Sequence, residues 1–110
     1  MRSGIRESDW KKFRKLHPIL LERFSHQILG EIRATIDGAG SSHERYLALL
    51  RQIKNRDKDV ADAFNDLRRS TALEQLLMIR RMNLLTGEEF AQFSDETREF
   101  VERIISAYKS

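Results

Sequence analysis

The chain has 110 residues, of which 40% are hydrophobic and 34% charged, with one proline and a formal net charge of +3. This length and composition are typical of a single folded domain with its own core rather than of a disordered chain. The lack of cysteine excludes disulfides, thiolate nucleophiles and cysteine-ligated metal sites. No stretch approaches the roughly 20 apolar residues of a membrane helix, and the first ten residues lack the apolar segment of a signal peptide. We therefore predict one cytoplasmic domain over residues 1–110, with residues 1–7 flexible.

The first predicted helix begins after Ser8, a residue type that caps helix N-termini. Side chains that recur every three or four residues then form one stripe, as on the buried face of a helix. The stripe comprises Trp10, Phe13, His17, Leu20, Leu21, Phe24, Ile28 and Ile32. Pro18 lies inside this helix and lacks the N–H of a helical hydrogen bond, so we predict a kink there. The alternative is a break, with a new helix beginning at Pro18.

A glycine-containing segment, residues 37–42, ends this helix. Gly38 is predicted to be its left-handed C-cap, and Gly40 adds flexibility. Ser41 and Glu44 have the spacing of a capping box, which predicts that a second helix begins here. Its predicted buried face comprises Tyr46, Leu49, Leu50 and Ile53.

A central helix is predicted from about Asp59 to Leu85, because apolar side chains recur at helical spacing throughout this range. They fall on two opposite sides, and a helix that is apolar on two sides needs cover on both. That cover could come from the same chain or from a second chain. We predict a tight turn near Asn55–Asp57 before this helix. The alternative is one continuous helix from Ser42 to Leu85, since a 3.5-residue repeat passes through the turn.

Two more helices are predicted after Leu85. Thr86 and Glu89 form a second capping box and begin a short helix, and Ser94 caps the last helix. The stripe of the last helix comprises Phe100, Val101, Ile104, Ile105 and Tyr108. No segment alternates with the two-residue period of a strand. The predicted fold is therefore all-α, a compact bundle of four to five helices.

The second apolar side of the central helix is the candidate partner surface. It comprises Leu73, Leu76, Leu77, Arg80 and Leu84. Arginine is enriched in protein interfaces, which favours this hypothesis for Arg80. The alternative is that Arg80 and Arg81 extend into solvent from side-chain stems that the chain itself covers. We predict a protein that acts through protein–protein contacts, as a homodimer or as an accessory subunit.

A basic cluster in the first helix gives the alternative function. It comprises Lys11, Lys12, Arg14 and Lys15, next to Trp10. Lysine and arginine neutralise phosphates, and an exposed aromatic ring can stack on a base. Trp10 lies on the apolar stripe, however, so its burial is predicted. The cluster therefore predicts at most weak, salt-sensitive nucleic-acid binding without sequence selection.

Catalytic and metal-binding patterns are weak. Asp59, Asp62 and Asp66 share one helix face, but their spacing differs from that of an EF-hand loop. The three histidines lack metal-ligand spacing, and no serine lies in a nucleophile elbow. We predict a non-enzymatic protein without cofactor or metal, and a small enzyme or acidic metal binder is the least favoured class.

Overall fold

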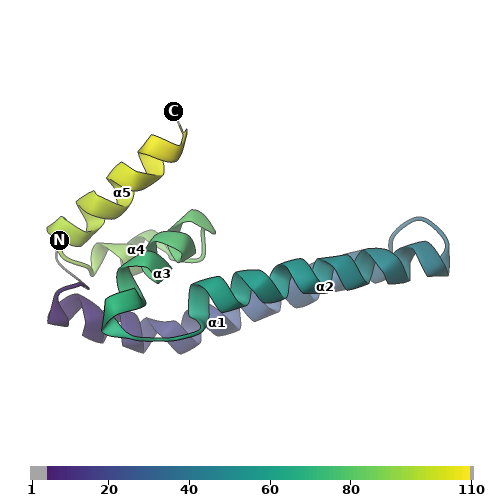
Figure 1. Cartoon of the computed structure of the whole chain (residues 1–110), viewed down its shortest axis with the longest axis horizontal. Coiled ribbons are helices and arrows are strands. Elements are labelled where there is room, and N and C mark those ends of the chain that lie inside the picture. Colours follow the sequence, from purple (N-terminus) through teal and green to yellow (C-terminus); the bar gives the residue numbers. More distant parts are fainter. Residues whose placement is uncertain (1–4, 110) are drawn as a thin grey trace.

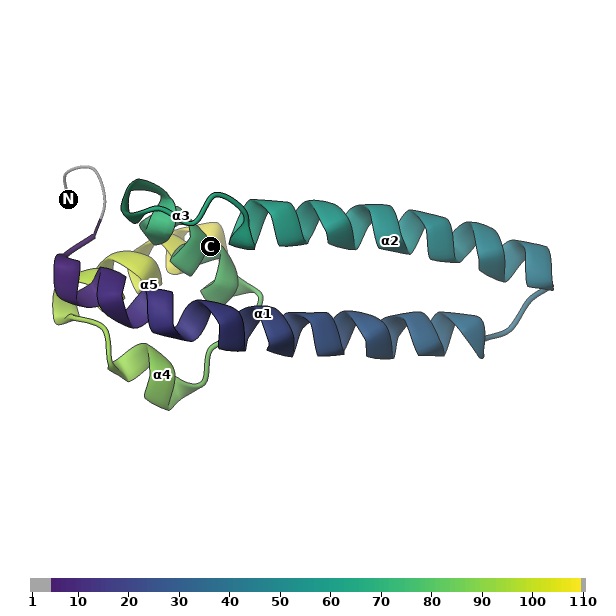
Figure 2. The same ribbon diagram turned by 90° about the horizontal axis from the view of Figure 1, so that it is seen from below.

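The computed structural model describes residues 5–109, and within that range every regular element is a helix (Figure 1). The elements are α1 (Glu7–Ile36), α2 (Ser42–Phe64), α3 (Arg69–Arg81), α4 (Gly87–Ala91) and α5 (Asp95–Lys109). This confirms the predicted all-α bundle. Helices α1 and α2 form a long antiparallel hairpin, and α3, α4 and α5 gather at one end of it (Figures 1 and 2). The molecule is accordingly elongated, with extents of 51 × 31 × 24 Å.

The hairpin divides the molecule into two regions. The base comprises residues 5–24 and 63–109, and it contains the buried core. Its largest fully buried apolar side chains are Phe13, Phe24, Leu20, Leu76, Ile79 and Val101. The arm comprises residues 25–62, and none of its residues is fully buried. Burial of apolar surface therefore stabilises the base far more than the arm.

Helix α1 is continuous across Pro18, so a new helix beginning there is excluded. The kink itself stays a prediction. The stripe keeps its phase past the proline, and Phe13, Leu20 and Phe24 on either side of it are all buried. Leu16, outside the predicted stripe, is buried as well.

The predicted central helix over residues 59–85 is wrong in its boundaries, because α2 and α3 are separate helices. Helix α2 runs unbroken through the predicted turn at Asn55–Asp57 and ends at Phe64. In the connection, Asp66 has a positive φ of 60°, a conformation that Asp and Asn adopt more readily than most residues. The break also excludes the alternative of one helix from Ser42 to Leu85.

Side chains of α3 hold this connection in place. The Thr71 hydroxyl donates to the carbonyl of Asp66 (2.8 Å) and accepts from the N–H of Arg68 (3.2 Å). The buried amide of Gln75 donates to the carbonyl of Asn65. Backbone groups released by the end of α2 thus find partners in α3, and such partners are needed wherever backbone leaves a helix inside a fold.

The predicted starts of α2, α4 and α5 are confirmed, whereas that of α1 is wrong: α1 begins at Glu7 with Arg6 as its N-cap, so Ser8 lies inside the helix and does not cap it. Both capping boxes, Ser41 with Glu44 and Thr86 with Glu89, are formed. The Ser94 hydroxyl accepts from the N–H of Thr97 at the start of α5 (3.3 Å). The prediction for the tip of the hairpin is wrong in one detail: the glycine with positive φ (104°) is Gly40, not Gly38.

The predicted flexible segment, residues 1–7, is ordered from residue 5 onward. Ile5 is buried in the core, and Arg6 pairs with Glu96 of α5 (3.0 Å). Glu7 already belongs to α1. Residues 1–4 lie outside the described part of the chain.

Two polar networks join α1 to the C-terminal half of the base. The buried Asp9 carboxylate accepts from the N–H of Ser94 (2.8 Å) and from the hydroxyls of Ser94 and Thr97 (2.7 Å each). Burial raises the pKa of Asp9, but these hydrogen bonds together lower it below its usual value. Arg23 forms two hydrogen bonds to Glu89 (2.8 and 3.1 Å), and these, with the hydrogen bond from the N–H of Thr86 (2.9 Å) and the charge of Arg23, lower the pKa of Glu89 to about 2.

Candidate interaction surfaces

Polar contacts hold the two helices of the arm together. The Arg56 guanidinium donates to both carboxylate oxygens of Glu31 (2.7 and 2.8 Å). Further out, the Thr35 hydroxyl donates to the side-chain oxygen of Gln52 (2.7 Å). These pairs fix the register of α1 against α2 and mark the side of each helix that contacts the other.

Five large apolar side chains of the arm are about half exposed. We call them the arm face: Leu29 (53% exposed), Ile36 (49%), Tyr46 (55%), Leu50 (42%) and Ile53 (45%). Within each helix they lie three, four or seven residues apart, which is the spacing of a helix stripe that contacts another helix. The prediction that Tyr46, Leu50 and Ile53 form a buried face is therefore wrong in this structure.

The arm face lies on one side of the hairpin. At about 100° per residue, Ile36 and Leu29 are turned roughly 100–120° from the contact residue Thr35. Ile53 and Tyr46 are turned by the same roughly 100–120° from Gln52, and Leu50 is turned further, by roughly 160°, to the outer edge of α2. Because α1 and α2 are antiparallel, equal turns in the same sense bring both sets to the same side. Direct adjacency supports this, since Ile36, Tyr46 and the half-buried Leu49 line one surface depression, together with Ser42 and Arg45.

The opposite side of the arm is polar. A shallow depression there is lined by Glu31, Arg51, Gln52, Asn55 and Arg56, together with Ala48. The remaining exposed large apolar residues of the described chain are Ile19, Leu47 and Tyr108. Ile19 and Tyr108 belong to the base, and Leu47 lines a different depression of the arm, with Ala48 and Arg51. Such isolated residues are normal on a protein surface. Exposed apolar side chains are therefore concentrated on the arm face and are not spread evenly around the hairpin.

The sequence-predicted partner surface is covered by the chain itself. Leu76 and Leu84 are buried in the core, and Leu73 and Leu77 pack partly buried against it. The Arg80 guanidinium lies 4.2 Å from the centre of the Phe90 ring. The second apolar side of the predicted central helix is thus covered by other residues of the base. The part of the prediction that placed Leu76 and Leu84 in a partner contact is therefore wrong.

The structure brings the basic cluster to one surface of α1. Lys11, Lys12, Arg14 and Lys15 line a groove together with Ser8. The Lys12 ammonium donates to the carbonyl of Gln92, so it also fastens α1 to the segment after α4. The Arg14 guanidinium lies 5.4 Å from the centre of the half-buried Trp10 ring. Stacking of Trp10 on a nucleic-acid base would require this arginine to move.

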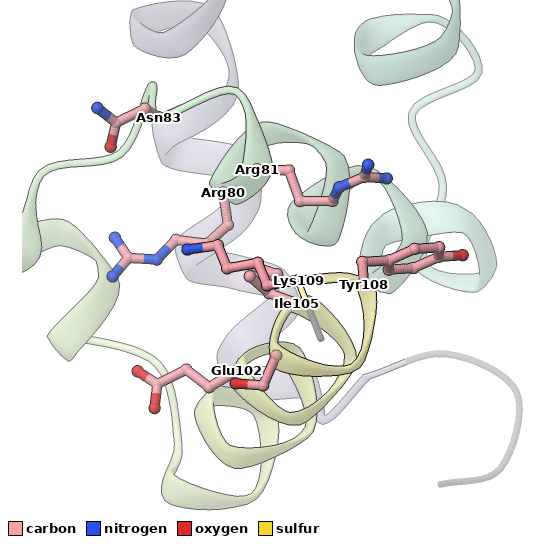
Figure 3. Close-up of a pocket in the computed structure, with 8 residues that line it drawn as sticks. Arg80, Arg81, Asn83, Glu102, Ile105, Tyr108 and Lys109 are labelled. Carbon is pink, nitrogen blue, oxygen red and sulfur yellow. The ribbon is translucent and has the colours of Figure 1, made fainter.

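A cavity of about 720 Å³ opens between α3 and α5, with several charged residues around it (Figure 3). Arg81 lies alongside the ring of Tyr108, at 4.7 Å from the ring centre (Figure 3). Arg80, Arg81 and Lys109 stand in the last turns of their helices, where the helix dipole favours cations. Ring contacts and helix ends thus account for these charges without a ligand.

Two of the acidic residues that the sequence offered as a metal site are held in ion pairs with arginines. Asp59 pairs with Arg56 (2.9 Å) and Asp66 pairs with Arg68 (2.6 Å). Among residues 5–109, no three His, Asp or Glu side chains gather closely enough to hold a metal ion. His17 packs edge-on against Phe64 and lies 3.1 Å from the Phe64 carbonyl, which is a structural position in the base.

Comparison with other proteins adds no relationship: no family model matches the chain, and neither a curated protein nor a solved structure shows significant similarity to it. Over the described part of the chain, no helix combines the length and apolar character needed to cross a membrane. The arm face was missed by sequence reasoning, although its three-and-four spacing is visible in the sequence. That spacing indicates that a helix face is covered but not by which molecule.

Proposed function

We propose that this protein is a non-enzymatic binding protein that acts through protein–protein contacts made by the arm face, as a homodimer or as an accessory subunit. The observation that carries the proposal is the grouping of five half-exposed apolar side chains on one side of the arm. Large contiguous apolar patches on a monomer commonly mark binding sites. The proposal keeps the cytoplasmic location expected from the sequence.

The position of the arm face supports this function. The arm projects from the base, so a partner can reach the face without displacing core residues (Figure 1). The patch also contains an aromatic residue, Tyr46, and aromatic side chains are enriched in the centres of protein interfaces. We thus propose the outer halves of α1 and α2 as the partner surface, in place of residues 73–84.

Photo-crosslinking in the cell of origin tests this proposal. A benzoylphenylalanine at Tyr46 retains an aromatic side chain in the arm face, and the matched control carries it at the exposed Asn55 on the polar side. We expect covalent protein adducts, with a second copy or with another protein, from Tyr46 but not from Asn55. Absence of adducts at Tyr46, or equal adducts at both positions, would reject the arm face as the binding surface.

A second proposal is weak, sequence-independent nucleic-acid binding by Lys11, Arg14 and Lys15. The observation that favours it is the exposure of all three in one groove. Covering of Trp10 by Arg14 weighs against it, because the aromatic contribution is then lost.

A further inference from the structure

We infer that the occupant of the arm face is the arm face of a second copy of this chain, so that two arms form a four-helix bundle. The inference rests on the proposed function of the arm as a protein-binding surface and names its partner. Three observations carry it. Each arm helix has a second, apolar stripe, the exposed apolar area of the arm matches that of a small dimer interface, and the base does not obstruct the arm face.

Each arm helix has two stripes. In α1, Glu31 and Thr35 contact α2, whereas Leu29 and Ile36 point to the arm face. In α2, Gln52 and Arg56 contact α1, whereas Tyr46, Leu50 and Ile53 form the second stripe. A helix of a four-helix bundle likewise contacts neighbours on two sides. The arm therefore resembles one layer of such a bundle without its other layer.

Two parallel stripes on one face favour an occupant with two helices. A single helix lying along the arm would cover mainly the groove between α1 and α2. A second hairpin offers one helix to each stripe, and each copy of this chain supplies such a hairpin.

The apolar area is in the range that a small dimer needs. Five large side chains that are each half exposed offer on the order of 500 Å² of apolar surface per copy. Two copies would then bury about 1,000 Å², the lower limit for a specific protein interface. An interface of this size predicts a reversible dimer with a dissociation constant on the order of 1–100 μM.

The base leaves room for this contact. Helix α1 contacts α5 through Asp9, and the buried Leu20 lies on the same side of α1, about 20° away at about 100° per residue. Leu29 and Ile36 are turned roughly 160–180° away from Leu20. The described helices α3, α4 and α5 gather at the base and leave the arm uncovered (Figures 1 and 2). Two arms can meet face to face with both bases on the outside.

Sedimentation equilibrium of the purified chain over a wide concentration range tests the dimer. The wild-type mass should rise from 13.0 kDa toward twice that value as concentration increases. Ile53→Glu should weaken the dimer more than about 100-fold, because it places a charge at an apolar contact twice. Asn55→Glu adds the same charge on the polar side and should leave the dimer unchanged. A monomeric wild type at millimolar concentration would overturn the inference, as would a dimer that Ile53→Glu does not weaken.

A cross-linking test avoids charged substitutions in case Ile53→Glu perturbs folding. The chain lacks cysteine, so a single introduced cysteine is the only thiol. With a bifunctional maleimide, Ile53→Cys should give covalent dimers at concentrations where Asn55→Cys gives none. Equal yields from the two variants would overturn the inference. If the chain is monomeric but its Tyr46 position still forms adducts with a different protein, the inference of a second copy is overturned and the proposed function is kept. Loss of all adducts would reject both.

Discussion

The base and the arm are built from the same two helices but are stabilised in different ways. In the base, Phe24 of α1 stacks on Phe64 of α2 at 6.0 Å between ring centres, under the cover of further helices. In the arm, the same helices are joined by an ion pair and by side-chain hydrogen bonds, and five of their large apolar residues are about half exposed. Helix stability in proteins comes mostly from packing of an apolar face. The comparison therefore teaches that the base is complete as a monomer, whereas the arm has an apolar face that another molecule can cover.

The largest expected effect contrasts a core residue with an arm residue. Phe24→Ala should lower the free energy of unfolding by about 3–5 kcal/mol, because it leaves a cavity beside Phe64. Ile53→Ala should cost less than about 1 kcal/mol, since its side chain is half exposed in the monomer. Urea unfolding at concentrations low enough to keep the chain monomeric measures both. Similar losses for the two variants would contradict the division into a packed base and an open arm.

A medium effect concerns acid, and it belongs to the base. The folded-state pKa of Glu89 is about 2, below its ordinary value of 4.5, chiefly because Arg23 donates hydrogen bonds to it. A lowered pKa contributes stability above pH 4.5 that is lost as the pH falls toward 2. With allowance for solvent around Arg23, we expect a loss of about 1–2 kcal/mol over this range.

Glu89→Gln should be less stable at neutral pH and should lose less stability between pH 4.5 and 2 than the wild type. Thermal melts across that range measure the difference. Asp9, whose pKa is also lowered, remains in the variant and should preserve part of the acid sensitivity. Identical pH profiles for the two proteins would show that the Arg23–Glu89 pair does not contribute.

The smallest expected effect tests whether binding resides in the arm alone. Lys11→Glu combined with Lys15→Glu changes exposed residues of the base, so stability should change by less than about 0.5 kcal/mol. Dimerisation should be unaffected. Fluorescence anisotropy with a single-stranded oligonucleotide should show at most weak binding to the wild type that salt abolishes. Tight, salt-resistant binding that the double variant loses would promote the basic cluster over the arm face.

The sequence predicts the local features of this fold well. Capping boxes depend on residues three positions apart, so Ser41 with Glu44 and Thr86 with Glu89 can be found without knowledge of the tertiary structure. The division between α2 and α3 could not be placed in the same way. Asn55–Asp57 and Asn65–Asp66 give similar turn signals, and distant partners decide between them. Arg56 reaches Glu31 on α1, whereas Asn65 is held by Gln75 of α3.

The candidate site was harder to predict for a related reason. Helical periodicity indicates that Leu76 and Leu50 both belong to covered faces, but it does not identify the covering molecule. In the folded chain Leu76 is buried by neighbouring helices, and Leu50 is left on the arm. The difference arises because α3 and α5 pack at the base, where Leu76 lies, and not on the arm, where Leu50 lies.

The long hairpin also sets the order in which the chain can fold. Contacts near the tip join residues close in sequence, such as Thr35 and Gln52, 17 positions apart. The Asp9 contact with Ser94 spans 85 positions. Contacts between near neighbours lose less chain entropy on closing and form sooner. During synthesis, α1 and α2 can therefore pair progressively from the tip of the arm as soon as α2 has emerged from the ribosome. The Phe24–Phe64 stack, by contrast, stays uncovered until α3 and α5 have been made. An emerging chain would thus pass through a state in which apolar surface at both ends of the hairpin is open to solvent.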